Sequence, residues 1–347
     1  MIEEEYGEKL SAVFDAFDEE PIAAASIGQV YHAVHEGREV AVKVQYPGVN
    51  RAVRADLQNM GLILRLMKSV APGIDVKAVG TEIRERIEEE LDYELEAANQ
   101  RALARVYKDH PFIVIPDVIG DISRERVIVS EFVHGRGFEE FKHDDQDARN
   151  RYGEIIFRFY FGSMYRHLQF SGDPHPGNCI LLNGGARMAF LDFGLFKRIS
   201  REAAEFELQT QRLGIEGRGR ELIDHMHEAG WIAEPEHYDP DEILRQFEDL
   251  VGWYTLDAEI ALTPEIATEV MITASDPRSQ YWGKIRHVSV PPEHLFARRL
   301  EGLTLAELGQ LRASNNWHRI AREWVYGEAP VTELGQAEAA WARERGI

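Results

Sequence analysis

Residues 172–194, GDPHPGNCILLNGGARMAFLDFG, contain the pattern that decides the fold and chemistry expected of this chain. Four residues separate Asp173 from Asn178, and Asp192 follows Asn178 by fourteen residues. Capping and turn chemistry explain Asp173 and Asn178 singly, but not the Asp-Phe-Gly triplet that follows a short hairpin pattern. The order and spacing are typical of phosphoryl transfer. They predict Asp173 as a catalytic residue that orients or deprotonates the attacking hydroxyl or water, and Asn178 and Asp192 as Mg²⁺ ligands.

A lysine far upstream supplies the cation that such a site needs. Lys43 lies in the apolar stretch Val40-Ala41-Val42-Lys43-Val44, where an unpaired ammonium is costly to bury. A lone lysine of this kind more often belongs to an edge strand and reaches solvent. With the downstream loop, Lys43 is instead predicted to bind the nucleotide phosphates and to take part in catalysis. The candidates for its carboxylate partner, on the acidic segment that follows, are Glu96, Glu90 and Asp92.

An alanine-rich segment, PIAAASIGQV at residues 21–30, precedes Lys43 at the distance of a nucleotide-covering Gly-rich loop. It has one glycine where three would be expected, and alanine methyl groups restrict the backbone. Such a segment alone usually only packs, but its position predicts nucleotide contacts from Ala24, Ala25, Ser26 and Val30. The backbone groups of Glu131 and Val133, at the end of a later strand, are predicted to bind adenine.

The order of elements predicts an α+β protein with two lobes. Strand patterns at 22–34, 39–45 and 126–132 come early, whereas residues from 148 onward are mainly helical. Helices are also expected at 3–17 and, as one long acidic helix, at 76–108. These patterns predict a β-rich N-lobe of residues 1–133, a helical C-lobe of residues 134–347, and a nucleotide in the crevice between them.

Composition narrows the partners. The net charge of −21 argues against broad binding to nucleic acid. The single cysteine excludes an intrachain disulfide and fits a reducing compartment. No apolar run approaches the length of a membrane span. The sequence therefore predicts a cytoplasmic protein.

Five motifs together carry a resemblance to a known family: AAASIGQV, VAVKVQYPGV, EELDYELEAANQ, GDPHPGN and LDFG. From about residue 7 to 200 the chain resembles the UbiB/AarF/ADCK family of atypical protein-kinase-like proteins. The resemblance implies a bilobal protein-kinase-like fold, ATP or ADP with Mg²⁺ as cofactors, and a role in ubiquinone or isoprenoid-lipid metabolism. A lipid or quinone precursor and a membrane surface become candidate partners. Glu90 and Asp92 would form the family's ExD motif, and Glu96 would pair with Lys43.

One family feature is missing, and two alternative functions stay open. The KxGQ motif that the family carries upstream of the Ala-rich loop does not occur here, so either that segment is missing or this member lacks it. The loop also resembles those of aminoglycoside and choline kinases, which makes a small-molecule phosphotransferase the second enzyme hypothesis. A nucleotide-gated scaffold without catalysis is the third hypothesis.

His175 lies where many protein kinases carry a lysine, and either a phosphate-binding or a loop-bracing role would fit it.

Overall fold

The computed structural model describes residues 1–53, 91–276, 278–281 and 288–346, which form two compact units. The first unit comprises Met1–Lys108, Val114–Gly135 and Ala189–Phe196, and the second comprises Asp109–Ile113, Arg136–Met188 and Lys197–Ile347. The proposed lobe boundary at residues 133/134 remains a prediction. Within the described ranges, none of the helices combines the length and apolarity that a membrane span requires.

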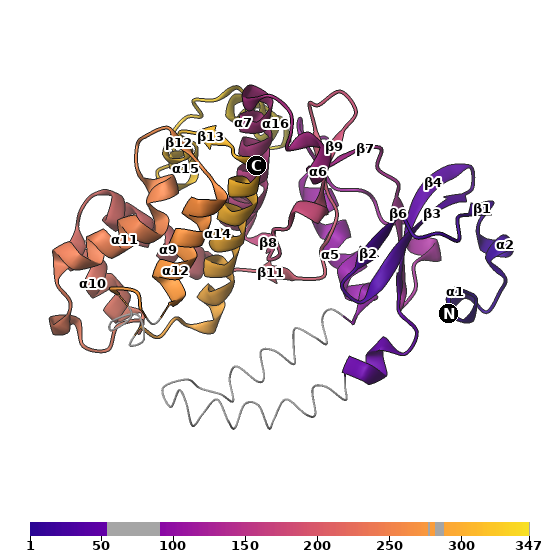
Figure 1. Ribbon diagram of the computed structural model, residues 1–347, viewed down its shortest axis with the longest axis horizontal. Helices are drawn as coiled ribbons and strands as arrows, with labels where there is room; N and C mark the ends of the chain where they lie inside the picture. Colours follow the sequence, from indigo (N-terminus) through magenta and orange to yellow (C-terminus); the bar gives the residue numbers. More distant parts are fainter. Residues whose placement is uncertain (54–90, 277, 282–287, 347) are drawn as a thin grey trace. The chain divides into compact units, whose positions relative to one another are not determined.

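The first unit is built on an antiparallel sheet in the order β1-β3-β4-β6, and β2 pairs with the first residues of β3, Gly28 to Val30 (Figure 1). Its strands are β1 (Ala16–Phe17), β2 (Ala23–Ala25), β3 (Gly28–His35), β4 (Arg38–Gln45) and β6 (Val127–Glu131). A tight turn at Glu36 and Gly37, both with positive φ, joins β3 to β4. The strands predicted at 39–45 and 126–132 are confirmed, and the one predicted at 22–34 is split by a turn at Ser26 and Ile27.

The two faces of β4 serve different purposes because successive side chains point to opposite sides of a strand. Val40, Val42 and Val44 enter a core shared with α1 (Ile2–Tyr6) and α2 (Leu10–Val13). Lys43 lies on the other face, opposite Ile128 of β6 in the strand register. Ile128 packs with Tyr93 and Ala97 of helix α5 (Tyr93–Val106). The alternation therefore directs Lys43 toward α5.

Two helix predictions in this unit are wrong at their boundaries. The helix expected at 3–17 is interrupted, because Gly7 adopts a left-handed conformation that ends α1, and Ala16–Phe17 pairs with β3 instead. The helix expected at 76–108 is not continuous in its described part, because α5 begins only at Tyr93. Residues 76–90 of that prediction lie outside the described residues. The apolar pattern at 112–119 also predicts a strand, but the strand found there is only β5 (Ile113–Val114).

The second unit is mainly helical, as the sequence predicted. Its helices are α6 (Phe138–Phe141), α7 (Gln146–Phe157), the π-helix η2 (Arg158–Gly162), α8 (Ser163–His167), α9 (Arg201–Ile215), α10 (Gly219–Glu228), α11 (Pro240–Thr255), α12 (Pro264–Ser275), α14 (Pro292–Leu311), α15 (Trp317–Val325) and α16 (Glu333–Arg345). Helices α9, α11, α12 and α14 run side by side (Figure 1). Two-residue strands β12 (Ile260–Ala261) and β13 (Ser314–Asn315) pair here, although only helix and loop were expected after residue 200.

The core of this unit combines aromatic side chains with one buried cation. Phe157 and Phe161 pack against Trp253, Tyr254 and Trp324. Beside them the fully buried Arg158 is surrounded by carboxylates.

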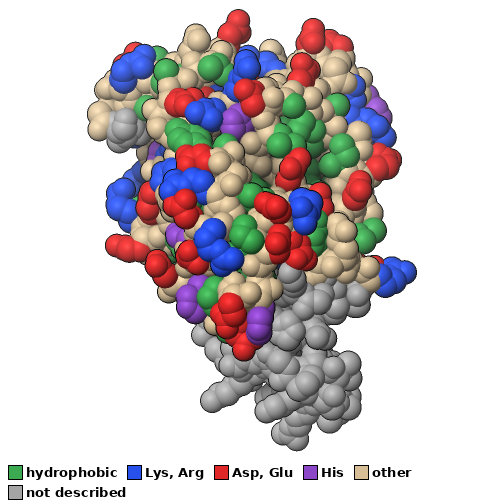
Figure 2. Space-filling view, turned by 90° about the vertical axis from the view of Figure 1, so that its left-hand side faces the viewer, with side chains coloured by type: hydrophobic (Ala, Val, Ile, Leu, Met, Phe, Trp, Pro, Cys, Tyr) green, Lys and Arg blue, Asp and Glu red, His purple; other side chains and the backbone are tan. Residues whose placement is uncertain are grey.

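On the face shown in Figure 2, acidic and basic side chains intermingle, without a continuous basic patch.

Short elements connect the rest of the chain. They are η1 (Gly120–Ile122), β7 (Gly135–Gly137), β8 (Gln169–Ser171), η3 (Pro176–Asn178), β9 (Cys179–Leu182), β10 (Met188–Phe190), β11 (Phe196–Arg198) and η4 (Pro235–His237). The hairpin expected after Asn178 is confirmed: the Leu182 amide donates to the Arg187 carbonyl, and Gly184 and Gly185 take positive φ in the turn.

Candidate active site

The first unit holds an ammonium group between two carboxylates. Lys43 Nζ donates to Glu96 Oε1 at 2.7 Å and to Asp192 Oδ2 at 3.3 Å. It also lies 5.3 Å from the centre of the Tyr93 ring. Three segments that are far apart in the sequence, in β4, in α5 and after β10, thus meet at one cation.

The three charged groups differ in exposure, and this difference matters for binding. Glu96 is buried, with 3% of its side chain exposed, whereas Asp192 is 31% exposed. Burial opposes the charged form of Lys43, but the nearby carboxylates of Glu96 and Asp192 raise its pKa. Lys43 is therefore charged at neutral pH. Glu96 holds it from the buried side, and Asp192 faces it from the open side.

Asp92 explains where α5 begins, and so how Glu96 reaches Lys43. Its Oδ1 accepts a hydrogen bond from the Leu95 amide at 2.9 Å, which satisfies one of the unpaired amides of the first helical turn. Asp92, one of the predicted candidates for the carboxylate partner of Lys43, is thus the N-cap of α5. Glu90, the other residue of the proposed ExD motif, lies outside the described residues.

The turn around Asp192 is fixed by two hydrogen bonds. The Gly194 amide donates to Asp192 Oδ1 at 2.9 Å, and Asn99 Nδ2 of α5 donates to the Phe193 carbonyl at 3.3 Å. A methyl group at Gly194 would come within 3.4 Å of Asp192 Oδ1. Asn99 was not among the predicted site residues, although its place three residues after Glu96 on α5 was a signal for it.

The Ala-rich loop is a tight hairpin of β2 and β3. Ala24 pairs with Gln29 and Ala25 pairs with Gly28, while Ser26 is exposed in the turn. Val30 lies opposite Lys43 in the β3–β4 register. Gly28 is required by close approach, because a Cβ there would lie 2.1 Å from the Val44 carbonyl oxygen.

The predicted adenine-binding segment follows β6. The Glu131 amide donates to the Asp117 carbonyl at 2.9 Å, and its carboxylate accepts from the Asp117 amide at 3.2 Å. These bonds fix the end of β6 just before Val133, which is half-buried.

In the second unit, the predicted catalytic loop, residues 172–178, is organised around Asp173. Arg299 of α14 donates to Asp173 Oδ1 at 2.6 Å and to the Gly172 carbonyl at 3.2 Å. Asn178 Nδ2 donates to the Asp173 carbonyl at 3.3 Å. His175 Nδ1 accepts the Gly177 amide at 2.9 Å, which is a loop-bracing contact. Arg299 was not predicted, because nothing in its local sequence marks it.

A buried carboxyl lies behind the same loop. Cys179 Sγ contacts Glu307 Oε1 of α14 at 3.5 Å, and both residues are buried. Glu307 Oε2 has no hydrogen-bond partner in the part of the chain that the structure describes. Burial raises the pKa of Glu307 to about 8. A neutral carboxylic acid therefore lies under the loop at pH 7.

The oxygen-bearing side chains near Lys43 fit Mg²⁺ that is bound together with a nucleotide better than Mg²⁺ that is bound by protein ligands alone. The described residues contain no group of three or more His, Cys, Asp or Glu placed to hold a metal ion. Mg²⁺ commonly uses one or two protein oxygens and takes its other ligands from phosphates and water. Asp192, half-open and oriented by the Gly194 amide, fits that requirement.

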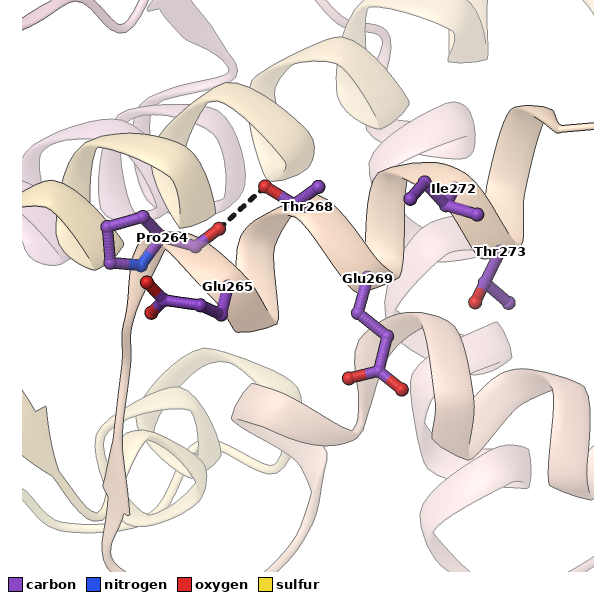
Figure 3. A pocket seen from close by; sticks show the side chains of 6 residues that line it. All are labelled: Pro264, Glu265, Thr268, Glu269, Ile272 and Thr273. Carbon is purple, nitrogen blue, oxygen red and sulfur yellow. Dashed lines mark hydrogen bonds between the residues drawn. The ribbon is translucent and has the colours of Figure 1, made fainter.

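A hollow on α12 is another place where a ligand could bind (Figure 3). It is lined by Pro264, Glu265, Thr268, Glu269, Ile272 and Thr273. All six residues come from one helix, and Thr268 Oγ1 donates to the Pro264 carbonyl of that helix at 2.7 Å. Among the described residues, no polar group from another element lines it, so the Lys43 and Asp173 regions remain the candidates.

The known proteins that this chain matches agree with these features. The ABC1 atypical kinase-like domain family matches residues 1–210. The chain belongs to this family. It is 36% identical over 219 residues to the Arabidopsis thaliana protein ACTIVITY OF BC1 COMPLEX KINASE 8, chloroplastic, covering 60% of this chain and 29% of that protein. It is 28% identical over 353 residues to the Caenorhabditis elegans protein atypical kinase coq-8, mitochondrial, covering 94% of this chain and 44% of the relative.

A solved structure extends the similarity to three dimensions. The complex of Rv3197 with erythromycin from Mycobacterium tuberculosis has a TM-score of 0.76 and 32% identity, covering 93% of this chain and 81% of the other. The α+β, bilobal protein-kinase-like fold predicted from the sequence is therefore confirmed, as is the resemblance to the UbiB/AarF/ADCK proteins. The chain spans less than half of the length of the two curated relatives named above.

Proposed function

We propose that this chain is an ATP-binding, Mg²⁺-dependent atypical kinase or ATPase of the UbiB type that supports ubiquinone or isoprenoid-lipid metabolism. The observation that carries the proposal is the ammonium of Lys43 between the buried Glu96 and the half-open Asp192. A buried lysine needs one carboxylate for neutrality. The second carboxylate is oriented by its own turn and partly open, as a metal ligand would be.

Each predicted site residue of the first unit would then have its own role in nucleotide binding. Lys43 would bind the α- and β-phosphates, with Glu96 holding its ammonium in place. The hairpin that carries Ala24, Ala25 and Ser26 would cover the nucleotide, with Val30 beside Lys43. The carbonyl of Glu131 and the backbone of Val133 would bind adenine, because the Glu131 amide is already used.

The residues of the catalytic loop would act on the acceptor. The attacking hydroxyl or water forms a bond to the γ-phosphorus as the bond to the ADP oxygen breaks, and its proton passes to the Asp173 carboxylate. Asn178 and Asp192 would hold Mg²⁺, which when bound neutralises charge on the phosphates. Asp92 and Glu90 would complete the family's ExD motif.

Calorimetric titration of the 347-residue chain with ATP and ADP, with and without Mg²⁺, tests the proposal. We expect binding that requires Mg²⁺ and is lost in Lys43→Ala. Asp192→Asn should keep the fold, but its nucleotide affinity should no longer rise when Mg²⁺ is added. Turnover should fall by about 10²–10³-fold in either variant, as when one charge-stabilising group is removed from an enzyme site.

Lys142→Ala is the matched control, because Lys142 also pairs with a glutamate, Glu139, but on the surface of the second unit. This control should bind and turn over nucleotide like the wild type. No Mg·nucleotide binding in the wild type, or undiminished turnover in both site variants, would contradict the proposal. Turnover measured with vesicles that contain quinone-precursor mimics, and with a panel of soluble alcohols, separates the lipid-linked function from a small-molecule phosphotransferase. If ATP is consumed but phosphate is transferred to neither class of acceptor, ATP hydrolysis is the activity.

A further inference from the structure

The predicted catalytic loop obtains its cation from a distant helix. Arg299 of α14 donates through Nη2 to Asp173 Oδ1 at 2.6 Å and through Nε to the Gly172 carbonyl at 3.2 Å. The two residues are separated by 126 positions in the sequence. One guanidinium thus holds both the backbone and the carboxylate of the loop.

His175 does not supply this charge. Two residues after Asp173, it occupies the position at which many protein kinases carry a lysine, but its Nδ1 accepts the Gly177 amide at 2.9 Å. Its backbone carbonyl also accepts the Asn178 amide at 2.9 Å. His175 is thus used to shape the loop. Within the described ranges, Arg299 is the cation that forms an ion pair with Asp173.

The pair is placed where it can serve the reaction rather than the fold. The side chains of Arg299 and Asp173 are 42% and 41% exposed, and an exposed ion pair contributes little to stability. A planar guanidinium that makes two hydrogen bonds does fix the direction of its partner. With Oδ1 held by Arg299, the second oxygen, Oδ2, would be the one that accepts from an acceptor hydroxyl.

Helix α14 is a suitable support for this contact. Eight residues after Arg299, about two helical turns later, Glu307 contacts Cys179 behind the same loop. The helix therefore meets the loop at both ends, at Gly172–Asp173 and at Cys179.

We propose that Arg299 is the positioning residue of Asp173 and takes the place of the lysine that protein-kinase catalytic loops carry. This inference rests on the proposed function, in which Asp173 receives the proton of the acceptor. It assigns to α14, outside the loop, a direct part in orienting the acceptor-side carboxylate.

The test compares Arg299→Gln, Arg299→Lys and Arg299→Ala with Arg319→Ala, which removes another exposed arginine–aspartate pair, to Asp257. We expect Arg299→Gln to lower kcat by about 10- to 100-fold while the KM for ATP changes less than about twofold. Arg299→Lys should keep part of the activity because it restores the charge. Added guanidinium at millimolar concentration should raise turnover in Arg299→Ala and not in Arg319→Ala.

Hydrogen exchange supplies a readout without nucleotide or turnover. In Arg299→Gln the amides of Gly177 and Asn178 should exchange faster than in the wild type, whereas Arg319→Ala should leave them unchanged. Unchanged kcat in Arg299→Gln, an increased kcat, or a loss of ATP affinity in place of kcat would each overturn the inference. The proposed function fails separately, through absent Mg·nucleotide binding in the wild type.

Discussion

Two cations, the fully buried Arg158 of the second unit and the partly buried Lys43 of the first, show that ion pairs can serve different purposes. Arg158 is fully buried and each of its nitrogens is paired: Nε with Glu154 at 2.7 Å, Nη2 with Glu323 at 2.6 Å, and Nη1 with Glu338 at 2.9 Å. Lys43 has one buried partner, Glu96, and one half-open partner, Asp192. Each nitrogen of Arg158 thus has a carboxylate partner, whereas the described partners of Lys43 include one that is partly open to solvent.

The difference separates a structural ion cluster from the proposed nucleotide site. Charges removed from water need complete pairing, and the Arg158 cluster provides it by joining η2 to α15 and α16. Lys43 keeps one partner at the longer distance of 3.3 Å, on a side chain that solvent reaches. An anionic ligand can therefore join that set without breaking the bond to Glu96.

The largest expected effect comes from breaking the saturated cluster. Arg158→Ala should lower the free energy of unfolding by about 3–5 kcal/mol, because it leaves Glu323 and Glu338 buried with one partner fewer. Lys43→Ala should cost less, about 1–2 kcal/mol, because Asp192 stays hydrated and Glu96, whose pKa is raised by burial, can take up a proton once the lysine is gone. Urea denaturation followed by circular dichroism measures both.

Arg158→Lys is a milder substitution, because it keeps the positive charge and loses the planar guanidinium. Its free energy of unfolding should lie between those of the wild type and Arg158→Ala. If Lys43→Ala destabilised the chain as much as Arg158→Ala does, the distinction between the two cations would be wrong.

A smaller effect separates geometry from charge at the Lys43 site. Gly28→Ala adds a methyl group that would lie 2.1 Å from the Val44 carbonyl and 2.9 Å from the Tyr93 hydroxyl. The β2–β3 hairpin must shift, at a cost of about 1–3 kcal/mol. Because Tyr93 lies beside Lys43, nucleotide affinity should fall although no charge has changed.

Gly37→Ala is the comparison variant for this prediction, since a Cβ at Gly37 meets nothing within 4 Å. It carries the strain of its positive φ alone. Thermal unfolding and nucleotide titration of both variants check the prediction. Equal nucleotide affinities in Gly28→Ala and Gly37→Ala would show that the close contact at Gly28 does not shape the site.

The sequence was most informative where local patterns dictate structure. The alternation in β4 places Lys43 opposite the valine core, and Gly184 and Gly185 mark the hairpin turn. The prediction failed at the ends of helices, because Gly7 and Asp92 can each interrupt a helical pattern, and the choice depends on tertiary packing. Local propensity is a weak guide at such positions.

Contacts between distant residues account for what the sequence did not reveal about the site. Arg299 is one of 31 arginine residues, and its partner lies 126 positions away. Arg158 likewise meets Glu323 and Glu338 over separations of 165 and 180 residues. Only the fold selects these pairs from many equivalent charges. The family motifs, by contrast, identified Lys43 and Glu96 before their contact was seen.

The smallest expected effect concerns a buried titratable group of a third kind, the Glu307 carboxyl, for which no cation partner occurs among the described residues. Burial raises the pKa of Glu307 to about 8, so the folded chain binds this proton more tightly than the unfolded chain does. Its contribution to stability is complete below the unfolded pKa of about 4.3 and is lost as the pH rises through 8. Glu307→Gln keeps the shape of the neutral acid and removes the titration. Raising the pH from 7 to 9 should therefore favour the variant over the wild type by about 1–2 kcal/mol.

Glu338→Gln is the control, because it removes a carboxyl of the saturated cluster. Burial opposes ionisation of Glu338, but His110, Arg166 and Arg158 lower its pKa to about 2. The carboxylate is therefore already ionised throughout pH 6–9, and this variant should lose a constant amount of stability over that range. Urea titrations at each pH separate the two patterns. If the Glu307→Gln and wild-type curves ran parallel, Glu307 would be ionised at neutral pH. The catalytic loop would then rest on a charged carboxylate rather than on a neutral acid.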